Sequence, residues 1–162
     1  MPGWLDAPRD LLRRVAATVK NAERSTGKTT RRREPPNRTV DAGVRIEYTP
    51  ALDGDPDPGE VVWTWVPFEE DPTLGKDRPV IVIGRRGDAL CGVALTTKHG
   101  ERADHVEVGT GPWDAQGRMS YAKVDRLLDI EPGEVRREGA ILGRRRFDAV
   151  IEAVDRLHDV VR

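Results

Sequence analysis

From residue 44 onward the apolar residues fall in short runs divided by glycine, proline and aspartate, and this pattern predicts a series of β-strands. The run VVWTWV at 61–66 alternates between two strand faces. The continuous apolar run PVIVIG at 79–84 indicates a strand that is buried on both faces. The predicted strands are residues 44–48, 61–66, 79–84, 89–98, 105–108 and 120–130, with 44–48 a candidate edge strand.

The two ends of the chain show helical periodicity instead. At 144–162 apolar residues recur every three or four positions, which predicts an amphipathic C-terminal helix. The same spacing at residues 8–24 predicts an N-terminal amphipathic helix with a basic opposite face. Residues 25–42 lack apolar periodicity and contain an arginine triplet and Pro35-Pro36, which is the composition of a linker.

These elements predict a mainly β fold with α, in which a small, strongly bent antiparallel sheet or barrel is covered by a C-terminal helix. The expected organisation is an N-terminal helix at 1–24, a basic linker at 25–42 and one β-rich domain at 43–162.

The composition narrows the class of site. Cys91 is the single cysteine and is expected in the core, so neither an internal disulfide nor a cysteine-based zinc site is expected. The three histidines show no ligand spacing, and no metal or other cofactor is expected. No apolar run approaches the roughly 20 residues that cross a bilayer, and the N-terminal residues do not resemble a signal peptide. We therefore expect no membrane association and a cytoplasmic location.

The near-zero net charge of −1 hides an asymmetry. Residues 1–50 hold 11 Lys and Arg against 6 Asp and Glu, a net charge of +5. Residues 51–162 hold 16 against 22, a net charge of −6. A basic arm on an acidic domain is typical either of a nucleic-acid contact or of a solvated tail.

Several short motifs follow one another in a recognisable order. They are Gly59-Glu60, VVWTWV, Asp71-Pro72-Thr73 with Gly75, Arg78-Pro79 before VIVIG, Thr96-Thr97, HVEV, Ser120, Asp125, and GAIL before the last helix. In this order they resemble the MazF/PemK toxins of bacterial toxin–antitoxin systems, over about residues 57–158.

The resemblance implies an SH3-like barrel of the CcdB/PemK type that forms a homodimer and binds RNA in a groove near the dimer interface. It also implies an endoribonuclease that cuts single-stranded RNA without a metal, under the control of an antitoxin protein. The ribose 2′-hydroxyl would attack the phosphate and leave a 2′,3′-cyclic phosphate and a 5′-hydroxyl.

By the same resemblance, Arg78 would be the catalytic arginine and Thr96 its hydroxyl partner. Thr97 competes with Thr96, because the alignment can slip by one residue. A guanidinium suits this role, since its rigid fork of donors matches the charge that builds on the non-bridging phosphate oxygens. Arginine does not readily accept a proton, so a general base is also needed. The candidates for that base are Glu69, Glu70, Asp71 and His99.

The candidate RNA contacts are cations and one aromatic residue near the same segments. They are Lys76, Arg85, Arg86, Lys98, His99 and Trp113. Trp113 lies in a Gly-Pro-Trp-Asp loop and is the better candidate for an exposed aromatic, whereas Trp63 and Trp65 are expected to pack in the core or at the barrel rim.

Two alternatives stay open at this point. The domain of net charge −6 is an unhelpful field for an RNA backbone, so a catalytically degenerate PemK-like barrel that binds nucleic acid or protein is the second hypothesis. In a third, residues 1–42 form an interaction arm for an antitoxin or regulator, and the barrel is a structural platform.

Overall fold

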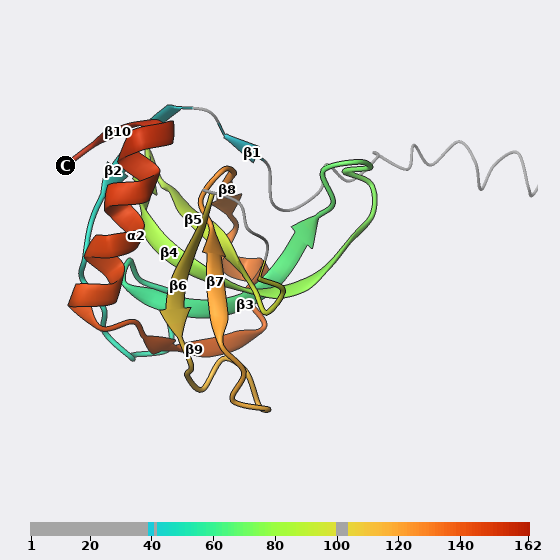
Figure 1. The fold of residues 1–162 in the computed structure, drawn as a ribbon. Helices are drawn as coiled ribbons and strands as arrows, with labels where there is room; N and C mark the ends of the chain where they lie inside the picture. The colour runs from blue at the N-terminus through green and yellow to red at the C-terminus, as the bar shows by residue number, and fades with distance from the viewer. Residues whose placement is uncertain (1–38, 41, 100–103) are drawn as a thin grey trace, which may run out of the picture. The chain divides into compact units, whose positions relative to one another are not determined.

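The computed structural model describes residues 39–40, 42–99 and 104–162. Over these residues the chain is mainly β-sheet with one α-helix near its C-terminus (Figure 1). The elements are β1 (Thr39–Val40), β2 (Ala42–Ile46), β3 (Glu60–Pro67), β4 (Gly75–Arg86), β5 (Ala89–Thr96), β6 (His105–Gly109), β7 (Ser120–Lys123), β8 (Leu127–Ile130), the 3-10 helix η1 (Pro132–Glu134), β9 (Arg137–Ile141), α2 (Arg144–Leu157) and β10 (Asp159–Val161).

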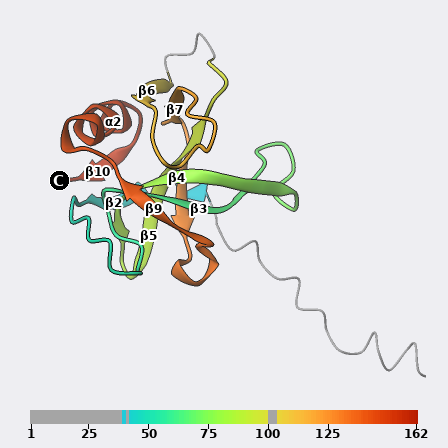
Figure 2. The same ribbon diagram turned by 90° about the horizontal axis from the view of Figure 1, so that it is seen from below.

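The long strand β4 organises the sheet. Its first half pairs with β3 and its second half with β5 and β2, all antiparallel. Beyond these neighbours, β3 pairs with β9, and β5 pairs with β8 and, at its end, with β7. These pairings curl the sheet, and α2 packs against β6 and β10 at one side of it (Figures 1 and 2). The predicted fold class, a bent antiparallel sheet with a C-terminal helix, is confirmed.

The core lies on both faces of β4. Ile81 and Ile83 point into a cluster that also holds Phe147 of α2, and Val80 and Val82 point into a second cluster with Leu128. The four β4 side chains are fully buried. The prediction of a strand buried on both faces is therefore confirmed, and burial of such β-branched side chains supplies the main stabilisation of the sheet.

Three details differ from the sequence prediction. The C-terminal helix ends at Leu157, and residues 159–161 form β10, which pairs parallel with β2. The segment 44–48 is consequently not an edge strand, since β2 has β4 on one side and β10 on the other. The segment 120–130 forms two strands, β7 and β8, rather than one.

The reason for the first difference is local. His158 adopts an extended conformation with φ −133° and ψ 152°, and its Nε2 lies 2.7 Å from the Val124 carbonyl oxygen. Val160 and Val161 then follow, and β-branched residues favour a strand over a helix. Their apolar spacing fitted the helical stripe, so periodicity alone did not separate the two structures.

The structure does not test most of the sequence prediction for the N-terminal part of the chain. The helix expected at 8–24 and the linker expected at 25–38 lie outside the described residues. Within the remainder of the predicted linker, β1 pairs antiparallel with β8.

Gly84 should be important for the close pairing of β2 with β4. It pairs with Ile46 where the β4–β5 register also shifts, and a Cβ there would overlap the carbonyl oxygen of Arg45. Because backbone cannot move aside cheaply, Gly84→Ala should lower the free energy of unfolding by about 3 kcal/mol. Urea unfolding followed by tryptophan fluorescence measures this.

The control is Gly133→Ala in η1, where nothing lies within 4 Å of the added methyl group. This variant should unfold within about 0.5 kcal/mol of the unchanged protein. Equal losses for the two variants would contradict the steric argument.

Candidate active site

The candidate site lies where β4 and β5 stop pairing. Their ladder ends at the Val80–Ala94 pair; from there β4 continues beside β3, and β5 turns to β7. Arg78 and Thr96 each lie two residues beyond this pair on their own strands, where Arg78 pairs with Thr64 and Thr96 with Tyr121. We call this divergence of the two strands the fork.

A cavity of about 210 Å³ opens at the fork. Arg78, Thr96 and Thr97 all line it, so the structure brings the three predicted catalytic side chains to one opening. We call it the threonine cavity. Its other lining residues include Lys76, Lys98, Trp63, Trp113, Asp114 and Arg118.

Arg78 is half-buried, and no hydrogen bond or ion pair to another described residue holds its guanidinium. Burial lowers its pKa, the charge of Arg126 lowers it further, and Glu69 acts in the opposite direction. The charge of Arg78, together with burial and Lys98, in turn lowers the pKa of Lys76. The site therefore concentrates positive charge, which suits an anionic ligand.

The two threonines differ in setting. Thr96 is the last residue of β5 and is half-buried, whereas Thr97 follows the strand and is exposed. The Thr96 Oγ1 accepts a hydrogen bond from the Lys98 backbone N–H at 3.2 Å. This bond uses an oxygen lone pair and leaves the hydroxyl proton available for a phosphate oxygen.

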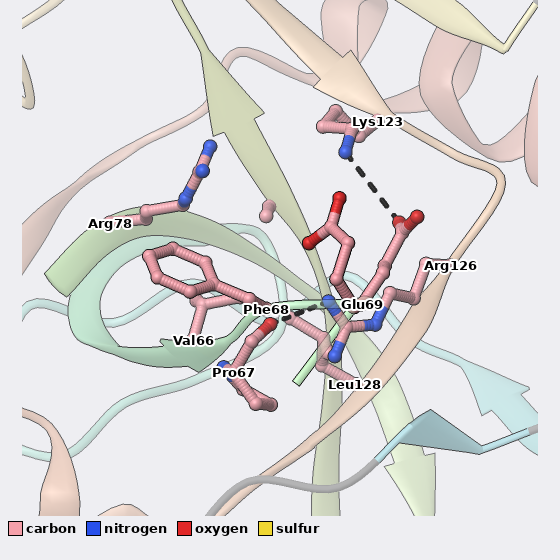
Figure 3. Close-up of a pocket in the computed structure, with 10 residues that line it drawn as sticks. Val66, Pro67, Phe68, Glu69, Arg78, Lys123, Arg126 and Leu128 are labelled. Atoms are coloured by element: carbon pink, nitrogen blue, oxygen red, sulfur yellow. Dashed lines mark hydrogen bonds and ion pairs between the residues drawn. The ribbon is translucent and has the colours of Figure 1, made fainter. Parts of the chain in front are cut away.

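Arg78 also lines a second cavity, of about 110 Å³, on the side of the β3–β4 loop (Figure 3). We call it the loop cavity. Glu69 and Glu70 of the loop line it, as do Lys123 of β7 and Arg126 of the β7–β8 turn. Glu69 pairs with Lys123 at 3.6 Å, and the Arg126 guanidinium donates to the Pro67 carbonyl oxygen at 2.7 Å.

The loop at 111–118 closes the threonine cavity and is well ordered by its own hydrogen bonds. The Asp114 carboxylate accepts from the Arg118 guanidinium at 2.9 and 3.1 Å and from the backbone N–H groups of Gln116 and Arg118. These bonds, above all those from the Arg118 side chain, lower the pKa of Asp114 to about 2. Asp114 therefore stays charged at any ordinary pH.

The expectation of an exposed Trp113 is wrong. Its side chain is 4% exposed and belongs to the main apolar cluster, and its indole N–H donates to the Ser120 Oγ at 3.1 Å. The ring lies so close to Gly111 that a Cβ there would overlap it. A buried indole with a satisfied N–H supports the wall of the cavity and offers no open face for a base.

The other predicted RNA contacts are spread out. Arg85 and Arg86 lie at the opposite end of β4 from the fork and are paired with carboxylates, Arg85 with Glu47 and Asp57, and Arg86 with Asp129. His99 is exposed and stacks on Tyr121 at 4.6 Å between ring centroids, beside the fork but not in the lining of either cavity. Lys76 and Lys98 are the predicted contacts that line the threonine cavity with Arg78.

Sequence reasoning missed three cations of the site: Arg118, Lys123 and Arg126. Lys123 and Arg126 lie on either side of Asp125, a residue of the motif series, so their segment could be identified from the sequence. The sequence could not show that β7 pairs with the end of β5, and this pairing brings Lys123 and Arg126 to Arg78. Cys91 is fully buried, in agreement with its expected place in the core.

Metal and membrane features can be judged only over the described ranges. There, no three or more His, Cys, Asp or Glu side chains group in a way that would hold a metal ion. No described helix is long and apolar enough to cross a membrane.

The fold and the fork define a small β protein with a basic cleft. Residues 57–158, more than half of the chain, match the family model for the PemK-like, MazF-like toxin of type II toxin–antitoxin systems. The chain therefore belongs to this family, as its motif order indicated.

Solved structures with a similar fold carry related descriptions. An endoribonuclease from a mycobacterial species is 16% identical, covers 68% of this chain and 94% of its own, and has a TM-score of 0.45. The MazE–MazF structure from Deinococcus radiodurans is 17% identical, with coverage of 63% and 94% and a TM-score of 0.48. The Mycobacterium tuberculosis toxin MazF-mt6 is 17% identical, with coverage of 59% and 94% and a TM-score of 0.43. No curated protein sequence matches the chain.

The hydrogen bond between Trp113 and Ser120 should couple the two residues energetically. Trp113→Phe and Ser120→Ala should each lower the free energy of unfolding by about 1–2 kcal/mol, because each leaves one buried polar group without its partner. The double variant should lose less than the sum of the two. Urea unfolding of the four proteins measures this, and strict additivity would show that the bond contributes nothing.

Proposed function

We propose that the protein is a metal-independent endoribonuclease that cuts single-stranded RNA at the fork, with Arg78 and Thr96 in contact with the scissile phosphate. The observation that carries this proposal is the common opening of Arg78 and the threonine hydroxyls in the threonine cavity. Membership of the PemK-like, MazF-like toxin family supports it, and one similar structure bears the description of an endoribonuclease.

In the proposed reaction the ribose 2′-oxygen attacks the adjacent phosphorus, and the bond from phosphorus to the 5′-oxygen breaks. Negative charge builds on the two non-bridging oxygens. The Arg78 guanidinium carries no competing carboxylate pair among the described residues, so its fork of donors is available to these oxygens. The Thr96 hydroxyl adds a further donor.

The 2′-hydroxyl proton needs an acceptor, and the 5′-oxygen needs a donor. Glu69 and Glu70 line the loop cavity with Arg78, so their carboxylates are candidates for the acceptor. Asp71 is placed differently, since its carboxylate caps the turn at Thr73. His99 on the other side of the fork stays a candidate for the donor.

The biological setting is part of the same proposal. In this proposal the enzyme is a cytoplasmic toxin that forms a homodimer and is held inactive by an antitoxin protein, and its family membership supports this setting. The MazE–MazF description of one similar structure supports an antitoxin partner. The expected arm at residues 1–42 is the segment of this chain that a partner would use in addition to the barrel. Deleting residues 1–38, which spares β1 and β2, tests this role, because it should weaken antitoxin binding while the β-domain stays folded.

Removal of Arg78 should abolish cleavage. Purified protein is incubated with single-stranded RNA in EDTA, and products are resolved on a gel. Arg78→Ala should cut about a thousandfold more slowly, as for the loss of a main transition-state donor. Arg78→Lys should recover less than about a tenth of the activity, because lysine keeps the positive charge but lacks the paired, planar donors of the guanidinium.

The control is Arg162→Ala, which removes a guanidinium that pairs with Asp155 on the exposed surface. It should cut at the unchanged rate. If no protein, the unchanged one included, cleaves RNA, the nuclease proposal fails and the non-catalytic binding barrel takes its place.

The two threonines should separate clearly in the same assay. Thr96→Ala should slow cleavage about a hundredfold, the order expected for one lost donor to the developing oxyanion. Thr96→Ser keeps the hydroxyl and should recover most of the rate. Thr97→Ala should stay within about threefold of the unchanged protein, because Thr97 is exposed and beyond the β5 register. The reverse order would assign the role to Thr97.

A further inference from the structure

The loop cavity presents three cations to one small space. Arg78 of β4 lies across it from Lys123 and Arg126, which come from β7 and the turn that follows (Figure 3). Its volume of about 110 Å³ suits a small anionic group better than a nucleobase with its sugar. Its floor is apolar, formed by side chains such as Val66, Ala94 and Leu128.

Two of these cations are close enough to disturb each other. The charge of Arg126 lowers the pKa of Arg78. The Arg126 guanidinium donates to the Pro67 carbonyl oxygen at 2.7 Å, which helps to fix its position at the cavity. Two guanidinium groups that line one cavity repel each other, and an anion bound in that cavity reduces the repulsion.

The third cation, Lys123, is held only in a weak ion pair. Lys123 pairs with Glu69 at 3.6 Å, and the Glu69 side chain is 49% exposed. An exposed pair of this length is worth little and is screened by salt. Glu69 stands on the loop after β3 and can leave Lys123 without uncovering the core, so a stronger anion can take its place.

The loop cavity and the threonine cavity share one lining residue, Arg78. An RNA strand that sets one phosphate at Thr96 can therefore set its neighbour on the other side of Arg78. We propose that the loop cavity binds the phosphate next to the scissile one, with Lys123 and Arg126 as its ligands, and that this phosphate displaces Glu69 from Lys123. The proposal rests on the RNA-cleaving function proposed above.

Salt-dependent binding tests this subsite without any cleavage. The probe is a fluorescein-labelled 2′-fluoro oligouridine of about 12 nucleotides, which has the RNA backbone and no 2′-hydroxyl nucleophile. Lys123→Gln should weaken binding about five- to tenfold at low salt. It should also reduce the slope of log affinity against log salt concentration by about 0.7, the value for one lost phosphate contact with a single strand.

Glu69→Gln should act in the opposite direction. It removes the carboxylate that competes for Lys123, so binding should tighten about threefold at low salt. In the Lys123→Gln background the same change should have no effect. A merely structural role of the Glu69–Lys123 pair would make both single variants weaken binding.

The matched control is Arg162→Gln, which removes one exposed cation of an ion pair far along the chain and should leave affinity and slope unchanged. A Lys123→Gln slope equal to that of this control overturns the subsite. If the unchanged protein cleaves RNA but the Lys123→Gln slope equals that of the control, the nuclease proposal holds and the subsite is overturned. If the unchanged protein does not cleave RNA but Lys123→Gln reduces the slope as expected, the phosphate-binding site holds and the nuclease proposal is overturned. If neither the unchanged protein nor any variant binds the probe, both proposals are overturned.

Discussion

The structure of the site depends on the separation of β4 and β5 after Val80–Ala94. Up to that pair the two strands share a ladder, and residues 80–83 of β4 and 90–94 of β5 are buried there. Beyond it each strand follows a different neighbour, so the backbones part and two cavities open between them. Arg78 is placed at this parting by β3, since it pairs there with Thr64.

Thr64, which pairs with Arg78 from β3, has a different role from Thr96, because β3 and β4 stay paired at this point. It is fully buried, and its Oγ1 donates to the Glu134 carbonyl oxygen at 3.3 Å, so it ties β3 to η1. Thr96 instead lines the threonine cavity with Arg78. Two threonines beside the same arginine thus serve packing in one case and an open site in the other. Only the topology of the sheet distinguishes them.

Ion pairs offset two of the carboxylates that line the threonine cavity. Asp77, directly before Arg78, pairs with Arg136 at 2.9 Å, and Asp114 is held by Arg118. At the far end of β4, Asp57 and Asp129 pair with Arg85 and Arg86. Exposed pairs of this kind add little stability. They do shape the local field, and the cations of the fork are left to dominate it.

The strands and the catalytic candidates could be predicted because they depend on local pattern and motif order. The apolar run at 79–84 indicated the central strand, and Arg78-Pro79 marked its entrance. Trp113 could not be placed, because its burial depends on Ser120 and Gly111. Nor could Lys123 be found, since its contact with the site arises from the non-local β5–β7 pairing.

The acidic loop after β3 then takes on a role that its sequence alone did not suggest. Arg126 fixes the start of the loop at Pro67, while Glu69 holds Lys123 only through an exposed pair. The loop is therefore held in place where it joins β3, whereas its contact with Lys123 at the cavity can be replaced by another anion. If a phosphate and Glu69 compete for the same ammonium group, each weakens the other by the same factor, as linkage requires. The negative charge of this loop would then select for a polyanion that can offer two phosphates, one on each side of Arg78, over an anion that can offer one.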